Sequence, residues 1–286
     1  MTSTDNGPRI VVGLDDTAAG LRAVTWAAAE ASARDCALSI VRAAARAEGG
    51  TWPSHGHQVL DAARAAVGET HPLLRVSTVQ VDDEPATALL EAAEDAVLLV
   101  TGLPSSTLVE SILGSVGLDL LGPASCPVAV VRPPDTVDGT VVVAGVGPHT
   151  DASAVLATAF AAAAAHHIPL TVVHVPDRGA SSTPDDLYDD IRLWSSPYPS
   201  VDVAVRTVAG EAAEVLAQMS QGARMLVVGG PGGHRGERGL FGSTTRSLAW
   251  NSRCPMVVTH TAAGTADRSA RLVGSSARAA DPPARG

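Results

Sequence analysis

Short apolar runs alternate with longer, Ala-rich amphipathic segments along most of this chain. The short runs are rich in Val, Leu and Ile, and the alternation is typical of a parallel sheet covered by helices. We expect strands at residues 9–14, 37–43, 74–81, 96–101, 127–132, 140–146, 169–175, 201–208, 224–229 and 255–260. We expect helices at residues 18–34, 57–68, 85–94, 112–122, 151–167, 184–194, 211–221 and 242–252.

The second half of the chain repeats the first. Gly114-Ser115 precedes Gly242-Ser243 by 128 residues, and Cys126-Pro127 precedes Cys254-Pro255 by the same spacing. A repeat of this length indicates duplication of a whole domain, because solenoid units are much shorter. We therefore predict one domain at residues 8–133, a second at 139–262 and a disordered tail at 263–286.

A glycine-rich segment follows the apolar run at residues 225–228 in the second domain. Gly229, Gly232, Gly242 and Ser243 spell G-x2-G-x9-G-S between a predicted strand and a predicted helix, and Thr244 comes next. Glycines let the backbone approach phosphate oxygens, and a helix N-terminus adds N–H donors and positive potential. We predict that this segment binds phosphate. The alternative is a tight connection that only requires permissive backbone angles.

The matching segment of the first domain is degenerate when the halves are overlaid at 128 residues. This overlay places Thr101 on Gly229 and Pro104 on Gly232. Proline has no N–H, and both replacements restrict φ. The matching segment of the first domain is therefore predicted not to bind phosphate. Asp15, which follows the first strand, is predicted to cap the next helix.

Composition excludes several classes of protein. The chain has a formal charge of −10 and no Lys, so it lacks the clustered cations of a nucleic-acid-binding protein. No apolar run is long enough to span a membrane, and the polar N-terminus lacks the features of a secretory signal, so we expect a cytoplasmic protein. Three Cys residues cannot form a full disulfide set, and Cys126 and Cys254 are predicted to be small buried residues before Pro.

The sequence offers little support for catalysis. A P-loop needs a Lys, and no G-x-S-x-G elbow, H-E-x-x-H pair or Cys/His metal cluster occurs. Ser243 has no base spaced to activate it, so it is predicted to donate a hydrogen bond to phosphate. His166 and His167 are predicted to be surface or helix-end residues.

These patterns resemble the universal stress protein family, in its tandem two-domain form. The resemblance rests on the Gly-x-Asp-like turn, the Leu-x-Val-x-His-Val second strand, the G-x2-G-x9-G-S loop and the closing Cys-Pro strand, and it covers residues 8–262. The Arg- and Ala-rich composition is associated with GC-rich bacterial genomes, such as those of actinobacteria.

The resemblance implies an α/β, Rossmann-like fold of two tandem open five-stranded parallel sheets with helices on both faces. It implies an intrachain pseudo-dimer in which Pro127–Arg132 pairs with Pro255–His260. It also implies ATP, with or without Mg2+, between the turn after strand one, the end of strand two and the glycine loop. The residues of domain 2 at these positions are Gly147, Val175, Gly229, Gly232, Gly242, Ser243 and Thr244.

Neither half carries the complete set of family residues. Gly147 stands where the family has an acid, and Asp15 keeps that acid in the first domain. We expect a non-enzymatic stress-response regulator that binds ATP or another adenine nucleotide in domain 2. Its further partner is a second copy of the chain or another protein, with no nucleic acid and no membrane. The alternative is a nucleotide-independent interaction module, and slow ATP hydrolysis is a third, weaker hypothesis.

Overall fold

The computed structural model describes residues 7–43, 55–103, 116–133, 139–148, 150–177, 183–230 and 242–260. The N-terminal half contains β1 (Arg9–Gly13), α1 (Ala18–Ala33), β2 (Ala37–Ala43), α2 (His55–Thr70), β3 (Val76–Val81), α3 (Pro85–Ala92), β4 (Leu98–Gly102), α4 (Val116–Asp119) and β5 (Val128–Val131). The C-terminal half contains β6 (Val142–Val146), α5 (Ala152–His166), β7 (Leu170–His174), α6 (Asp185–Ser195), β8 (Val203–Thr207), α7 (Ala212–Met219), β9 (Met225–Gly229), α8 (Ser243–Asn251) and β10 (Met256–Thr259).

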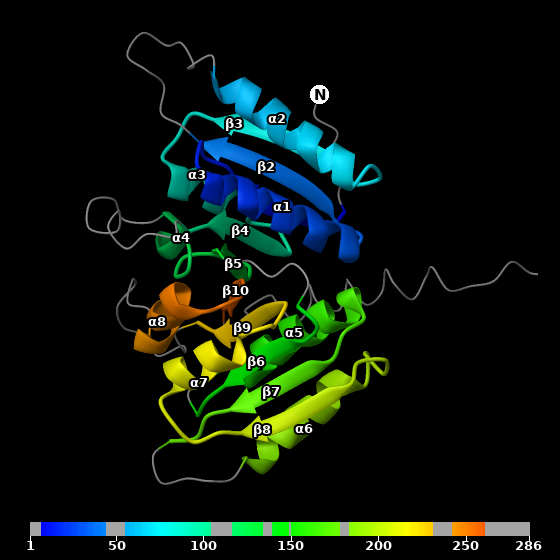
Figure 1. The fold of residues 1–286 in the computed structure, drawn as a ribbon, viewed down its shortest axis with the longest axis vertical. Helices are drawn as coiled ribbons and strands as arrows, with labels where there is room; N and C mark the ends of the chain where they lie inside the picture. The colour runs from blue at the N-terminus through cyan, green and yellow to red at the C-terminus, as the bar shows by residue number, and fades with distance from the viewer. Residues whose placement is uncertain are drawn as a thin grey trace, which may run out of the picture.

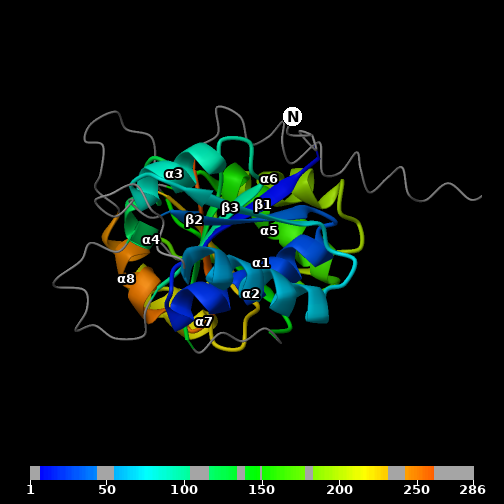
Figure 2. The same ribbon diagram turned by 90° about the horizontal axis from the view of Figure 1, so that it is seen from above.

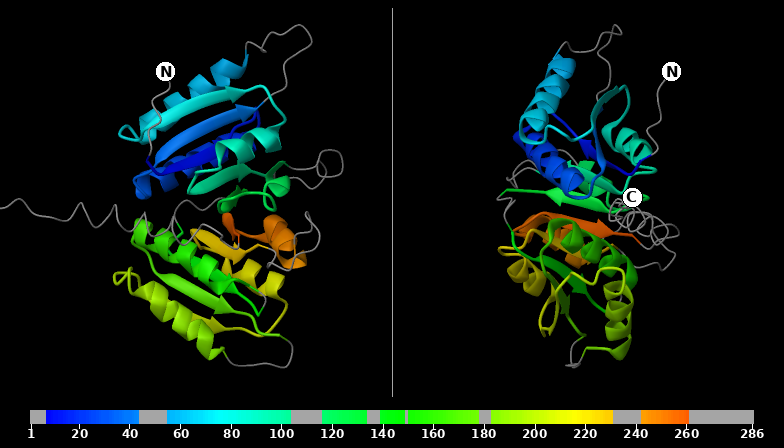
Figure 3. Two further views of the ribbon diagram at one scale, coloured as in Figure 1. Left: turned by 180° about the vertical axis from the view of Figure 1, so that it is seen from behind. Right: turned by 90° about the vertical axis from the view of Figure 1, so that its right-hand side faces the viewer.

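All ten strands belong to one sheet in the order β3-β2-β1-β4-β5-β10-β9-β6-β7-β8. Within each half the neighbouring strands are parallel, and β5 pairs with β10 in antiparallel orientation, with Ala129 opposite Val257. In Figures 1 and 3 these two strands lie side by side in the middle of the molecule. The predicted pair of open five-stranded sheets, joined through their last strands, is confirmed.

Helices cover both faces of the sheet. In the view from above, α1 and α2 lie on one side of the strands of the N-terminal half and α3 lies on the other (Figure 2). One apolar cluster includes residues of α1, α2, α5 and α6, and a second includes residues of α3, α7 and α8. The central strands are buried on both sides and read as continuous apolar runs. The edge strands β3 and β8 alternate partly buried and exposed residues.

The strand register gives an independent alignment of the halves. Gly13 in β1 and Gly145 in β6 are equivalent, because each is closely approached by a leucine of the third helix in its half. A Cβ on Gly13 would lie 2.9 Å from Leu89 of α3, and one on Gly145 would lie 2.7 Å from Leu216 of α7.

This alignment corrects the overlay made from sequence spacing. Gly145 lies opposite Val228 in β9, whereas Val12, which precedes Gly13, lies opposite Val100 in β4. Thr101 is therefore equivalent to Val228, and Gly102 is equivalent to Gly229. The placement of Thr101 on Gly229 was wrong by one residue. Pro104 and Gly232 themselves lie outside the described residues.

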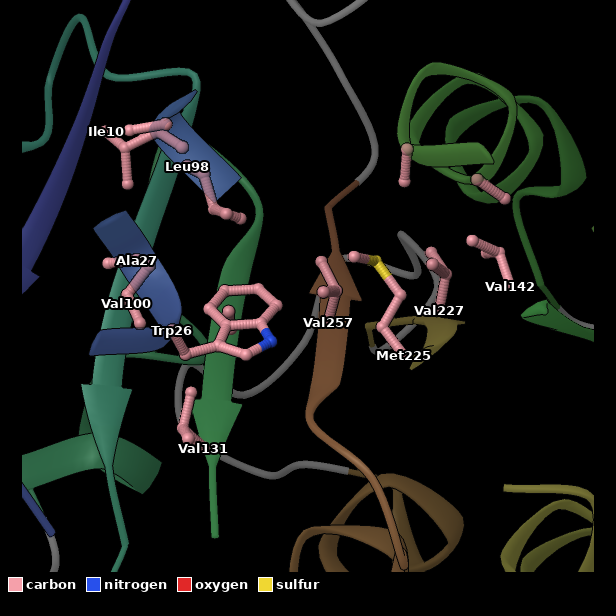
Figure 4. Close-up of a cluster of buried hydrophobic side chains, with 14 of the residues drawn as sticks. Ile10, Trp26, Ala27, Leu98, Val100, Val131, Val142, Met225, Val227 and Val257 are labelled. Carbon is pink, nitrogen blue, oxygen red and sulfur yellow. The ribbon is translucent and has the colours of Figure 1, made fainter. Parts of the chain in front are cut away.

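The two halves share an apolar core across β5 and β10. Trp26 of α1 is 1% exposed and belongs to the same cluster as Val131 of β5 and Val257 of β10. In Figure 4 its indole is directed toward Val257. The helix that follows the first strand thus packs against both halves.

A buried carboxylate also joins the halves. Glu30 of α1 has no exposed surface, and its Oε2 accepts hydrogen bonds from Arg34 Nη2 at 3.0 Å and Nε at 3.1 Å. Its Oε1 faces the other half, where it lies 2.6 Å from His166 Nε2 and accepts from Arg224 Nη2 at 3.3 Å. His166 is the last residue of α5, as predicted, but its side chain is not at the surface.

The surroundings of Glu30 determine its charge. Burial acts to raise the pKa of Glu30, but Arg34, the hydrogen bond with His166 and the charge of Arg224 together lower it to about 2. The carboxylate is therefore ionised at neutral pH and holds cations from both halves.

Candidate functional site

The candidate site of the C-terminal half lies at the carboxyl ends of β6, β7 and β9. Open parallel sheets bind ligands at this edge, next to the point where the strand order reverses. Gly147 directly follows β6, Val175 follows β7, and Gly229 ends β9. A Cβ on Gly147 would lie 3.9 Å from the carbonyl oxygen of Val175, so the structure brings these two predicted residues together.

Thr150 connects Gly147 to Gly229. Its Oγ1 accepts a hydrogen bond from the N–H of Gly147 at 3.1 Å. Its Cγ2 lies 2.6 Å from the position of a Cβ on Gly229, so a side chain at Gly229 would require Thr150 to shift. Thr150 was not among the predicted site residues, because its role depends on a contact with a strand far away in the sequence.

Helix α8 presents its N-terminus at the same edge. Its N-cap is Gly242, which makes no side-chain capping bond, and its first turn contains no acidic residue. The first amides of a helix have no partner within the helix, and no side chain among the described residues caps them here, so they can donate to a ligand. A Cβ on Gly242 would meet nothing within 4 Å, and Ser243 is exposed while Thr244 is partly buried.

A side chain ties this helix start to the end of β9. Thr245 is buried, and its Oγ1 donates to the carbonyl oxygen of Gly229 at 3.4 Å. Gly229, Gly242, Ser243 and Thr244 are therefore held near one another. Gly232 lies outside the described residues.

The equivalent edge of the N-terminal half is occupied by the chain itself. Asp15 Oδ1 accepts from the N–H of Thr17 at 3.1 Å and from its Oγ1 at 2.6 Å, and Thr17 is the N-cap of α1. The prediction that Asp15 caps the helix is therefore wrong: Thr17 is the capping residue, its side chain accepts from the N–H of Gly20, and Asp15 holds Thr17 in place. A Cβ on Gly102 would lie 2.3 Å from the carbonyl oxygen of Ala19, so the backbone of α1 fills the space beside β4.

An ion pair also links two segments of the chain at this edge. Arg42 Nη2 lies 3.0 Å from Asp16 Oδ2, which links the end of β2 to the turn after β1. The equivalent residues Gly13 and Gly145 pair with Val41 and Val173, respectively. Arg42 and His174 come directly after these partners, so they are equivalent in the two halves. The two edges therefore differ in charge as well as in shape.

The described residues offer few other reactive groups. Cys36, Cys126 and Cys254 are buried and form no disulfide, and the predicted burial of the last two is confirmed. Burial raises the pKa of Cys36 to about 11 and that of Cys254 to about 12, so these thiols stay protonated at neutral pH. No cluster of His, Cys, Asp or Glu in the described ranges could hold a metal ion. In the same ranges no helix has the length and apolar character to cross a membrane.

Comparison with known proteins identifies the family. The two glycine-containing halves define a tandem α/β protein of Rossmann-like architecture, and the model of the Universal stress protein family matches residues 8–132 and 187–260. The chain is 30% identical over 294 residues to universal stress protein Rv2623 of Mycobacterium tuberculosis, covering 90% of this chain and 98% of that protein. It therefore belongs to the universal stress protein family.

Two further similarities agree with this assignment. Universal stress protein Rv3134c of Mycobacterium tuberculosis is 30% identical over 243 residues, covering 79% of this chain and 89% of that protein. The crystal structure of a universal stress protein from Archaeoglobus fulgidus matches with a TM-score of 0.61 at 17% identity, covering 88% of this chain and 98% of that chain. At this identity the structural match supports the fold alone.

Proposed function

We propose that the protein binds ATP or another adenine nucleotide at the edge formed by Gly147, Val175, Gly229 and the start of α8. The observation that carries the proposal is the uncapped N-terminus of α8, which has no acidic residue in its first turn. Helix starts of this kind bind anions through free N–H groups and the helix dipole. Ser243 and Thr244 add hydroxyl donors at the same end.

The base and sugar of the nucleotide would lie near Gly147 and Val175. The space around Gly147 supports this placement, because the nearest atoms to a Cβ there would be 3.6 Å and 3.9 Å away. The carbonyl oxygen of Val175 faces this space and can accept from an exocyclic amine. Mg2+ would be held by the nucleotide phosphates and not by a dedicated carboxylate, because Gly147 supplies none.

We propose one nucleotide per chain, because the two edges are filled in different ways. Beside Gly229 the space is taken by the methyl group of Thr150, and a side chain can rotate when a ligand enters. Beside Gly102 it is taken by the backbone of Ala19 in the first turn of α1, which cannot move without breaking the helix. The N-terminal half is then structural.

The protein acts in this proposal as a regulator without catalysis of its own, in the cytoplasm. A bound nucleotide would stabilise α8 and the turn after β6, and a second copy of the chain or another protein would detect that change. Ser243 at a helix start is suited to donate to phosphate, as expected from the sequence.

Gly242→Val tests the site with little risk to the fold. The substitution places a branched side chain over the free amides of α8, at a position where a Cβ meets nothing within 4 Å. We expect the affinity for fluorescent ATP to fall at least tenfold. Gly68→Val in α2 is the matched control, because a Cβ there also meets nothing within 4 Å, and its ATP affinity should equal that of the wild type. Unchanged ATP binding by Gly242→Val would show that α8 is not the phosphate site.

A nucleotide-independent interaction module is the second candidate. Gly147 favours it, because this residue cannot provide the carboxylate that the family resemblance implies at that position. Mass analysis of small molecules released on denaturation separates the two candidates. Release of no nucleotide, together with no binding at millimolar ATP, would favour the second.

A further inference from the structure

Arg132 of the N-terminal half caps the last turn of α8 in the other half. It follows β5, and its Nη1 donates to the carbonyl oxygen of Ala249 at 3.2 Å and to that of Trp250. Its guanidinium carbon lies 5.3 Å from the ring centroid of Trp250. The last carbonyl groups of a helix have no partner within the helix, so Arg132 satisfies them from outside and places a cation at the negative end of the dipole.

The contact has a counterpart on the other side of the interface. His260 follows β10, and its Nε2 interacts with the carbonyl oxygen of Leu121, which comes after α4. At the spacing of 128 residues that relates β5 to β10, His260 corresponds to Arg132 and Leu121 to Ala249. Each half therefore supports the end of the last helix of its neighbour, but only the support of α8 carries a permanent charge.

Helix α8 depends on contacts at both of its ends. It has only nine residues, and helices of this length are not stable in isolation. Thr245 joins its first turn to Gly229, and Arg132 joins its last turn to the N-terminal half. A change at one end therefore alters the stability and the orientation of the amides at the other.

We propose that Arg132 is a positioning residue for the nucleotide site of the C-terminal half, and that nucleotide binding in turn strengthens the contact between the halves. This inference rests on the proposed function. Arg132 touches no nucleotide; it holds α8 so that the amides after Gly242 converge on phosphate. Coupling between two sites is reciprocal. If the contact of Arg132 with α8 increases the affinity for ATP, bound ATP strengthens that contact by the same free energy.

Arg132→His tests the inference, because it replaces a permanent cation by one that titrates with an unperturbed pKa of about 6.5. Calorimetric titration of the full chain with ATP is performed at pH 6 and pH 8, and each affinity is divided by that of the wild type at the same pH. The division cancels the titration of the phosphate itself. We expect ATP binding by the variant to be weakened about fivefold to tenfold at pH 8 and to recover most of that loss at pH 6.

Arg253→His is the matched control, because Arg253 is exposed, lies just after α8 and, among the described residues, makes one side-chain-independent hydrogen bond, from its backbone N–H to Ser220 Oγ. Its relative affinity should be the same at both pH values. Failure of the wild type to bind millimolar ATP would overturn the proposed function. Normal ATP binding by the wild type, with equal relative affinities of Arg132→His at pH 6 and pH 8, would overturn the role of Arg132 alone.

Hydrogen exchange on the wild type provides a readout that requires no variant to fold. ATP should slow amide exchange at the start of α8, at Ser252 after its last turn and in β5 beside Arg132. Protection that stops within the first turn of α8 would show that the two ends are not coupled.

Discussion

At the residue scale, the ionised Glu30 makes the free energy of unfolding depend on pH. Its pKa of about 2 in the folded protein lies below the ordinary value of 4.5, so its contribution to stability is complete above about pH 4.5 and disappears as pH falls toward 2. The difference corresponds to about 3 kcal/mol. Chemical denaturation between pH 6 and pH 3 should show about two thirds of this loss in the wild type.

Glu30→Gln should remove most of this acid dependence. The amide cannot neutralise Arg34 and Arg224, so the variant should also lose about 3–5 kcal/mol of unfolding free energy at pH 7. Glu91→Gln is the control, because Glu91 is exposed and should give a wild-type denaturation curve. An equal loss in both variants would contradict the proposed importance of the buried carboxylate.

Gly229 and Gly102 should respond differently to an added methyl group. Gly229→Ala places its Cβ against the Thr150 methyl and should lower the unfolding free energy by about 1–3 kcal/mol. Adding Thr150→Ser should restore the lost stability, because serine keeps the hydroxyl but lacks the methyl. Gly102→Ala places its Cβ against the backbone of Ala19 and should lower the unfolding free energy by more than Gly229→Ala does. Urea denaturation of the single and double variants measures this. A cost for Gly229→Ala that persists in the double variant would show that Thr150 does not fill this space.

At the scale of secondary-structure elements, α1 holds the two halves together. Trp26→Ala should lower the unfolding free energy by about 3–5 kcal/mol, because it leaves a cavity against β5 and β10. Leu21→Ala on the same helix should change it by less than about 0.5 kcal/mol, because Leu21 is 49% exposed. Equal effects in a thermal or urea denaturation series would contradict the packing of α1 across the interface.

The sequence predicted these elements more reliably than their alignment. The ten strands were predicted, because buried parallel strands produce clear apolar runs. The pairing of β5 with β10 was expected only from the family resemblance, and its antiparallel orientation comes from the structure. The overlay of Thr101 on Gly229 failed because a run such as Leu98–Val100 contains no polar residue to fix its register. Strand pairing, and not sequence spacing, identified Gly102 as the equivalent residue.

Contacts between distant segments could not be predicted in the same way. Glu30 was detectable as a charge on the Ala-rich buried face of α1, but its partners His166 and Arg224 lie in the other half. Thr150 and Arg132 likewise act on strands and helices far away in the sequence. No local pattern specifies such partners, because they depend on how the two halves dock.

At the scale of the whole molecule, the continuous sheet predicts cooperative unfolding. The halves share the pairing of β5 with β10, the apolar cluster around Trp26 and the buried Glu30. We expect calorimetry to show a single transition whose calorimetric and van't Hoff enthalpies agree. Two separated transitions would show that the halves unfold independently.

We propose that one half of this universal stress protein accepts a nucleotide and the other does not. Isothermal titration of the full chain with ATP and magnesium distinguishes one site from two, because it measures the binding stoichiometry. We expect one ATP per chain. Two sites of similar affinity, or no binding at millimolar ATP, would contradict it.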